Sequence, residues 1–385
     1  MDYTINIAEE GLIKGYEEFI RNKISLLHSK EIFIWGASVR GTVLGIMLDA
    51  NGINDFSYVD NDYTKWGQNI GGHLIFPPKE IMSRDIFVLV AVQYGTEIVQ
   101  ELINMNVKNY IWLETNTAKE FVDELDRKDR NKNLIFGEGL LENIQIGNKQ
   151  DKSIKNLIWE MYQKEDNKVL SINCIGMEMI YNLLKILLLR GQLANRVLIF
   201  LNHETLTDWH HFLPRVQHVD VLEKINCEEV FLKEYISRAK HYSQNYMVEK
   251  NYSPQRTYDK EALREDVEKQ YLLMTTLCEL GEDFVEVQFL TEIVKYLVSN
   301  RRDICIVQMP VNYELGEKIY PTRFSETINR KNLFVKNTIE KSGGRYIDLS
   351  YLLEEKYFVT GVTIQDSITY SGKKILLERI SDEFK

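Results

Sequence analysis

The run of seven apolar residues Ile86–Val92 (IFVLVAV) constrains the fold of this chain more than any other feature. A strand that is apolar on both faces is typical of a parallel sheet with helices on both sides. Two further strand-like runs, Glu31–Trp35 and Phe56–Val59, precede it, and the helical apolar spacing of Val39–Ala50 lies between them. Strands that alternate with helices predict right-handed βαβ units, so we expect an α/β protein with a doubly wound sheet.

A second alternating series follows later in the chain. Its expected strands are Val169–Ile172, Val197–Leu201, Ile304–Gln308 and Tyr346–Leu349. The 385 residues suffice for two or three domains at about 100–200 residues each. We predict two tandem three-layer α/β domains, over 1–130 and 166–385. Because 117–165 is rich in charge and glycine, we expect a connector over 131–165.

A helical insert is expected within the second domain, at about 227–300. It carries many tyrosines and charged residues. This composition fits a lid or a contact between subunits of a homo-oligomer, and it fits a simple packed helical layer better.

Composition excludes several classes of protein. The formal net charge is −10 and there is no basic block, which argues against binding to nucleic acid or an anionic membrane. The four cysteines lack CxxC spacing, which argues against a zinc site or a disulfide framework and fits a reducing compartment. The acidic N-terminus does not resemble a secretory signal, and the apolar stretch Ile180–Leu189 is too short to span a bilayer. We therefore expect a cytoplasmic protein without a membrane anchor.

A glycine-rich turn joins the first expected strand and helix. The segment FIWGASVRGTVLG places Gly36 and Gly41 there, where they permit a tight turn and let helix amides face an anion. Asp60 ends the next strand, where a carboxylate can accept a ribose hydroxyl. Ser38 stands where a dinucleotide fingerprint has its second glycine, so redox use of NAD is a weak alternative. The two glycines also fit a purely structural role in close strand–helix packing.

Residues 31–113 resemble a known pattern. With WGASVRG, FSYVDND and KWGQNIGGHLIFPPKEI, they are similar to small Rossmann-like modules of sugar-modifying proteins. Examples are the N-terminal domain of bacterial sugar O- and N-acyltransferases and the C-terminal domain of some sugar methyltransferases. The resemblance implies a nucleotide or nucleotide-linked sugar as the ligand, near Gly36, Ser38, Arg40, Gly41 and Asp60. Arg40 would pair with a phosphate, or it is a solvated residue at the helix start.

Three segments of the second domain carry another pattern, in which a strand runs into a polar loop. They are VLSINCIGMEMI, CIVQMPVNYE and the stretch from GGRYIDLS to YSGKK. Loops at the carboxyl ends of parallel strands should converge where such sheets bind ligands. Over 168–201 and 303–383 the pattern resembles the SGNH hydrolase superfamily, especially the branch of the D-alanine-transfer protein of teichoic acid synthesis. In that family a serine follows the first strand, and a late Asp-x-x-His opens the last helix.

The resemblance implies roles for particular residues. Cys174 takes the approximate place of the serine, while Asp366 and Thr369 take the places of the late Asp and His. Cys174 is then a thiolate nucleophile, or else an inert packing residue. Asp366 would line the pocket or cap the last helix. The candidate polar contacts to substrate are Asn173, Asn202, Asn312 and Thr369.

A threonine hydroxyl cannot accept a proton at neutral pH, so a base must come from elsewhere. The segment FLNHETLTDWHHFLPRVQH holds four of the seven histidines, and His203 and His210 are the candidates. Its spacing does not match HExxH, so we predict no metal. These histidines could instead line a polar cleft, or be ordinary surface or core residues.

Two readings of function follow. In one, an SGNH-type acyl-ester hydrolase or acyltransferase modifies a surface glycan or a sugar metabolite. Cys174 is its nucleophile, and Asp366 with His203 or His210 is its acid/base pair. In the other, a non-catalytic pseudoenzyme binds the same small-molecule or glycan ligand after losing the catalytic histidine.

Overall fold

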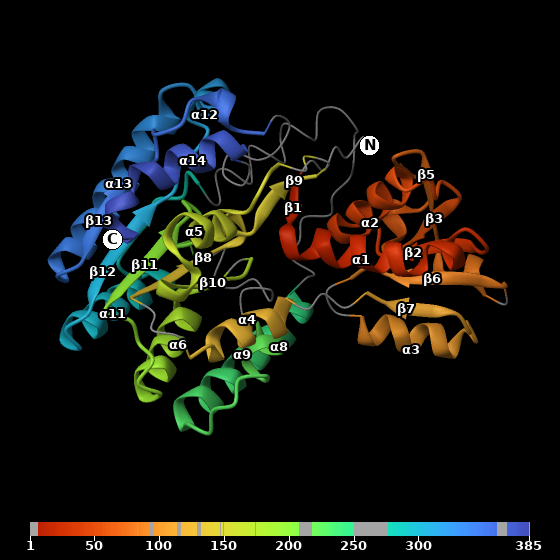
Figure 1. Ribbon diagram of the computed structural model, residues 1–385, viewed down its shortest axis with the longest axis horizontal. Coiled ribbons are helices and arrows are strands. Elements are labelled where there is room, and N and C mark those ends of the chain that lie inside the picture. Colours follow the sequence, from red (N-terminus) through yellow and green to blue (C-terminus); the bar gives the residue numbers. More distant parts are fainter. Residues whose placement is uncertain are drawn as a thin grey trace. The chain divides into compact units, whose positions relative to one another are not determined.

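The computed structural model divides into two compact units (Figure 1). The first unit is Met1–Thr117 with Gln145–Asn148, and the second is Ala118–Ile144 with Lys149–Lys385. The structure describes residues 7–82, 84–92, 95–113, 117–128, 132–146, 148, 150–173, 175–207, 218–249, 276–359 and 368–384. No helix among these residues is both long and apolar enough to cross a membrane.

The first unit is built on a six-stranded sheet with the order β4-β5-β3-β2-β6-β7. Its strands are β2 (Glu31–Trp35), β3 (Phe56–Val59), β4 (Asn69–Ile70), β5 (His73–Phe76), β6 (Ile86–Val90) and β7 (Tyr110–Trp112). All neighbouring strands are parallel except the β4–β5 pair. The chain moves outward from β2 through β3 to β5 and then returns to the other side of β2 with β6. This reversal creates a topological switch point between β2 and β6.

Helices flank this sheet. They are α1 (Glu10–Leu27), α2 (Val39–Ala50) and α3 (Thr96–Asn104), and a short strand β1 (Ile7–Glu9) precedes them. Leu102 of α3 clusters with Phe33, Trp35 and Val88 of the sheet. Every residue of β6 is buried, as expected for the apolar run that predicted it. The predicted bounds of β2, β3 and α2 agree with the structure.

The second unit contains a five-stranded, fully parallel sheet with the order β10-β8-β11-β12-β13. Its strands are β8 (Asn133–Gly137), β10 (Asn167–Ser171), β11 (Arg196–Leu201), β12 (Asp303–Gln308) and β13 (Arg345–Asp348). In chain order this is the 2-1-3-4-5 arrangement of doubly wound sheets. The fold class predicted from the sequence, two α/β domains with parallel sheets, is therefore confirmed.

Alternate residues of these strands enter two separate cores. Leu134 and Phe136 pack with one set of helices, α6 (Met177–Leu189) and α11 (Val285–Ser299) among them, whereas Ile135 packs with α5 (Ile154–Tyr162) and α14 (Tyr370–Arg379). The other helices and the short strand β9 are α4 (Thr117–Asp126), β9 (Asn143–Gln145), α8 (Val219–Leu222), α9 (Val230–Glu249), α12 (Tyr313–Ile319) and α13 (Arg323–Lys341). The second unit is thus a three-layer sandwich (Figure 1).

The range 131–165, which we expected to be a connector, contains folded elements of the second unit. β8 and α5 lie within it, and β8 pairs with both β10 and β11. The three glycines between 137 and 147 suggested a loop, yet all five residues of β8 are buried. The first strand of the second sheet therefore begins at Asn133, 36 residues before the expected start at Val169.

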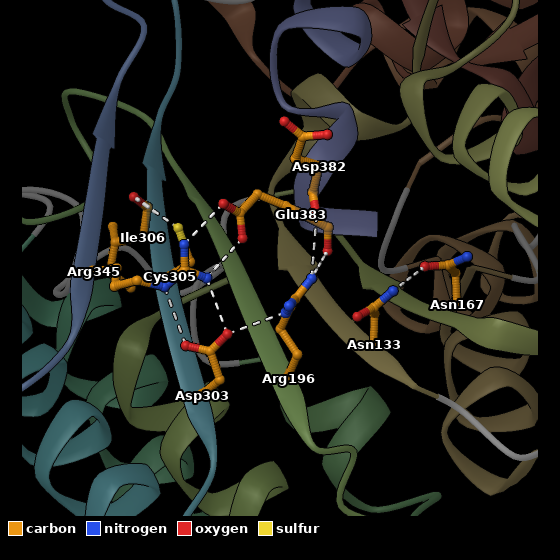
Figure 2. Close-up of polar contacts among 9 residues, drawn as sticks. All are labelled: Asn133, Asn167, Arg196, Asp303, Cys305, Ile306, Arg345, Asp382 and Glu383. Atoms are coloured by element: carbon orange, nitrogen blue, oxygen red, sulfur yellow. Dashed lines mark hydrogen bonds and ion pairs between the residues drawn. The ribbon is translucent and has the colours of Figure 1, made fainter. Parts of the chain in front are cut away.

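Charged side chains join the amino ends of three strands (Figure 2). Asp303 accepts hydrogen bonds from Arg196 Nε at 3.1 Å and from Arg345 Nη2 at 3.0 Å. Arg345 also binds both carboxylate oxygens of Glu383, at 2.8 and 2.7 Å. Glu383 lies in the final turn (Ser381–Phe384), so this cluster attaches the end of the chain to the sheet. Ligands of such sheets bind at the opposite, carboxyl edge.

Candidate functional site

The glycine turn of the first unit has no space for side chains. Gly36 has φ +115°, and a Cβ there would lie 2.6 Å from Val92 Cγ1. A Cβ at Gly41 would overlap the carbonyl oxygen of Gly36. Both glycines are therefore required by the backbone, which supports the structural role that the sequence left open. Ser38 is exposed and Arg40 is half-buried, and both residues follow the carboxyl end of β2.

Asp60 holds this turn closed. Its Oδ2 accepts hydrogen bonds from the Ala37 amide at 2.8 Å and from Lys65 Nζ at 3.0 Å, and its Oδ1 accepts one from the Asp62 amide at 2.9 Å. The sequence predicted a carboxylate that accepts a ribose hydroxyl. The structure gives both oxygens partners within the protein, so Asp60 positions the loop that follows β2.

The first strand of the second sheet ends in Gly137-Glu138-Gly139. The SGNH resemblance implied a serine after the first strand of the sheet. That strand is β8 in the structure, so the expectation applies to this segment and not to Cys174. Cys174 follows the second strand, β10, at the edge of the sheet, and lies outside the described residues. The misplacement arose because β8 was taken for part of a connector. No hydroxyl or thiol side chain stands at this place.

The ends of β8, β10 and β11 meet at the carboxyl edge of the sheet. A Cβ at Gly139 would lie 2.8 Å from Asn173 Oδ1, so Asn173 is adjacent to the place expected for the serine. Glu138 is buried and accepts a hydrogen bond from the Thr205 hydroxyl. Of the predicted substrate contacts, Asn173 is exposed, whereas Asn202 is buried. The sequence analysis did not single out Glu138. The apolar run LIF and Gly137 precede it, just as the run FIW leads into Gly36 at the first glycine turn.

His203, a candidate base, is buried after β11. Its Nε2 lies 3.2 Å from Ser350 Oγ, which also accepts a hydrogen bond from Asn332 Nδ2 at 2.8 Å. Burial, and then the positive charge of Lys331, lower the pKa of His203 to about 3. Ser350 is buried too, so this serine–histidine contact belongs to the core. A neutral imidazole with so low a pKa is a poor proton acceptor at pH 7, which argues against His203 as a base.

Two predicted substrate contacts cap helices instead. Asn312 Oδ1 accepts the Leu315 amide at 3.1 Å at the start of α12. Thr369 Oγ1 accepts a hydrogen bond from the Gly372 amide at 3.4 Å, so Thr369 is the N-cap of α14. Capping residues must keep their side chains on the helix amides, so these two are poorly placed to contact a substrate.

The other predicted catalytic residues, Asp366 and His210, lie outside the described residues, as Cys174 does. Within the described part of the chain, no group of three or more His, Cys, Asp or Glu side chains is arranged to hold a metal ion. The described carboxyl edge thus offers polar side chains for binding, but not an assembled nucleophile and base.

Comparisons with known proteins give structural similarity at low sequence identity. No protein-family model matches, and no curated protein matches. Among solved structures, the acetylxylan esterase Axe2 from Geobacillus stearothermophilus is similar at a TM-score of 0.32 and 12% identity, covering 66% of this chain and 94% of that one. LAE5, an alpha/beta hydrolase enzyme from the metagenome of Lake Arreo in Spain, is similar at a TM-score of 0.33 and 7% identity, covering 67% and 96%. Similarity at this level does not assign an activity.

Proposed function

We propose that the second unit is an SGNH-type scaffold that binds an acylated sugar at the carboxyl edge of its sheet without hydrolysing it. The observation that carries this proposal is Gly137-Glu138-Gly139 at the end of the first strand, where a hydrolase needs its serine. Acyl transfer requires a nucleophile with a base beside it. Here the serine's place has no side chain that can attack.

The late histidine's place and one of the two candidate bases support the same proposal. Thr369 takes the place of the late histidine and caps α14, and the buried His203 has a pKa of about 3. The exposed Asn173 beside Gly139 is suited to a hydrogen bond with a sugar hydroxyl or an acyl carbonyl, whereas the buried Glu138 and Thr205 bind each other. This favours the pseudoenzyme reading over the hydrolase reading.

One observation favours an active enzyme as a second candidate. Asn173 lies against Gly139, and Cys174 is the next residue in the chain. In that case the Cys174 thiolate attacks the acyl carbonyl, the C–O ester bond breaks, and the sugar oxygen takes a proton from an acid such as Asp366 or His210. Water or a second sugar hydroxyl then cleaves the thioester and restores the thiolate.

For the first unit we propose binding of a nucleotide-linked sugar at the glycine turn. The exposed Ser38 and the half-buried Arg40 at the carboxyl edge of β2 support this role, since an arginine pairs well with phosphate. In this proposal the Asp60 carboxylate binds the Ala37 amide of the turn and does not bind the ribose. Together the two units would recognise the activated and the acylated forms of a sugar used in glycan or metabolite modification.

Hydrolysis and binding of an acetylated sugar test the proposal for the second unit. We expect peracetylated xylobiose to bind in isothermal titration calorimetry while acetate release stays at the rate of buffer alone. The exposed Asn173→Leu should abolish binding, and Asn226→Leu, an exposed control, should not. Acetate release that Cys174→Ala abolishes, and Cys227→Ala does not, would establish the second candidate. Absence of binding by the wild type would refute both.

A further inference from the structure

Two large aromatic side chains lie exposed just after β3 of the first unit. Tyr63 is 74% exposed and Trp66 is 41% exposed. Their ring centroids are 6.5 Å apart with the planes at 76°, an edge-to-face pair. Neither ring belongs to the buried core of this unit. Aromatic side chains of this size contribute most to stability or binding when they are buried, so a ligand that covers the two rings would gain affinity from the contact.

The pair is fixed to the glycine turn by hydrogen bonds. Trp66 Nε1 donates to the main-chain oxygen of Asp60 at 2.7 Å, and the Asp60 carboxylate binds the Ala37 amide at 2.8 Å. Tyr63 opens a short helical turn whose cap, Asp62, accepts the Thr64 amide at 3.0 Å. Trp66 is therefore held at the turn by its own hydrogen bond, and Tyr63 is in edge-to-face contact with it.

Sheet topology places the pair beside the proposed phosphate position. β2 and β3 are parallel neighbours, with Trp35 opposite Val59, so the segments that follow them lie at the same edge of the sheet. A ligand whose phosphates meet Arg40 in the turn after β2 can extend across this edge toward β3. The part of the ligand that lies there would meet the rings of Tyr63 and Trp66.

We propose that Tyr63 and Trp66 form a stacking subsite for the nucleobase of a nucleoside diphosphate, and this inference rests on the nucleotide-binding role proposed for the first unit. A planar base offers a π face to an aromatic ring, and stacking of this kind tolerates different bases. Loss of one stacking ring weakens binding by roughly 5- to 100-fold when the usual energies are converted to affinity. The subsite therefore contributes affinity for the base and leaves recognition of the phosphates to the glycine turn.

Titration of the full chain with UDP, CDP, ADP and GDP, and with ribose 5-phosphate as a ligand without a base, tests the subsite. We expect Tyr63→Ala and Trp66→Ala to raise the Kd of a nucleoside diphosphate by roughly 5- to 100-fold and to leave that of ribose 5-phosphate unchanged. Trp66→Phe, which loses the hydrogen bond to Asp60 but keeps a ring, should recover most of the affinity. Leu74→Ala removes another exposed apolar side chain and is the matched control.

Each other result overturns the inference in a distinguishable way. If the wild type binds a nucleoside diphosphate and the alanine variants bind it equally well, the subsite is wrong and the nucleotide-binding role stands. An equal rise in the Kd of ribose 5-phosphate for the alanine variants would show that the two residues only support the loop. The same conclusion would follow if Trp66→Phe bound a nucleoside diphosphate as weakly as Trp66→Ala does. If the wild type binds none of the four diphosphates, the role proposed for the first unit fails, and the subsite with it.

Discussion

Lys373 of α14 offers the most stringent test of the second unit. Its ammonium donates to Asp151 Oδ1 and Oδ2 at 2.9 and 3.1 Å, and to the main-chain oxygens of Asn143 and Lys152 at 2.9 and 3.1 Å. The Lys373 and Asp151 side chains are 2% and 1% exposed. The variant Lys373→Met keeps a flexible apolar stem of similar length and removes the charge. The Asp151 carboxylate would then be buried without its cation.

The expected loss follows from this burial. Removing one partner of a buried ion pair lowers the free energy of unfolding by about 3–5 kcal/mol, because the remaining charge stays buried without an opposite charge beside it. Removing both charges should cost far less, since apolar side chains of similar volume often replace such a pair at little cost. We therefore expect Lys373→Met to lose about 3–5 kcal/mol, and Lys373→Met with Asp151→Leu to recover most of it.

Guanidinium unfolding, followed by near-UV circular dichroism and by fluorescence, measures these differences. In thermal unfolding, a loss of about 3–5 kcal/mol would lower the Tm of the second unit by roughly 6–20 °C. The neighbouring Lys374→Met is the control, because Lys374 is exposed and should change stability by less than about 0.5 kcal/mol. The reasoning is refuted if Lys373→Met and Lys374→Met unfold alike, or if the double variant is no more stable than Lys373→Met.

Three further predictions concern other parts of the structure. Gly41→Ala should destabilise the first unit by about 3 kcal/mol or more in thermal unfolding, because its Cβ would overlap the oxygen of Gly36, whereas Gly15→Ala in open space on α1 should stabilise it by about 0.5–1 kcal/mol. Partial burial alone would raise the pKa of Asp303, but its two arginine partners outweigh that effect and lower it. Asp303→Asn should therefore lower the free energy of unfolding by about 1 kcal/mol at pH 7. In urea titrations this difference should vanish as the pH falls below about 4 and through the lowered pKa of Asp303. Thr369→Ala should lose about 0.5–2 kcal/mol by the same assay while Thr369→Ser keeps the cap; equal losses would exclude capping.

The fold was largely predictable, and the candidate site was not. The apolar run of β6 and the glycine signals around α2 lie within short windows, so their bounds could be read from local spacing. β8 escaped because a short apolar run ending in glycine resembles a loop until its neighbours are known. With β8 as the first strand, the position that the resemblance implies for the nucleophile moves from Cys174 to the segment that follows β8.

The order of amino acids by itself determined the alternation of strands and helices, the α/β class and the two glycines that close the first turn. These depend on side-chain periodicity and on backbone angles, which act between residues a few positions apart. Only tertiary structure decided that Asp60 binds the Ala37 amide 23 residues away and that His203 contacts Ser350 across 147 residues. Folding brings such groups together and removes them from water, so burial and partner choice decide whether a polar side chain binds, caps or reacts.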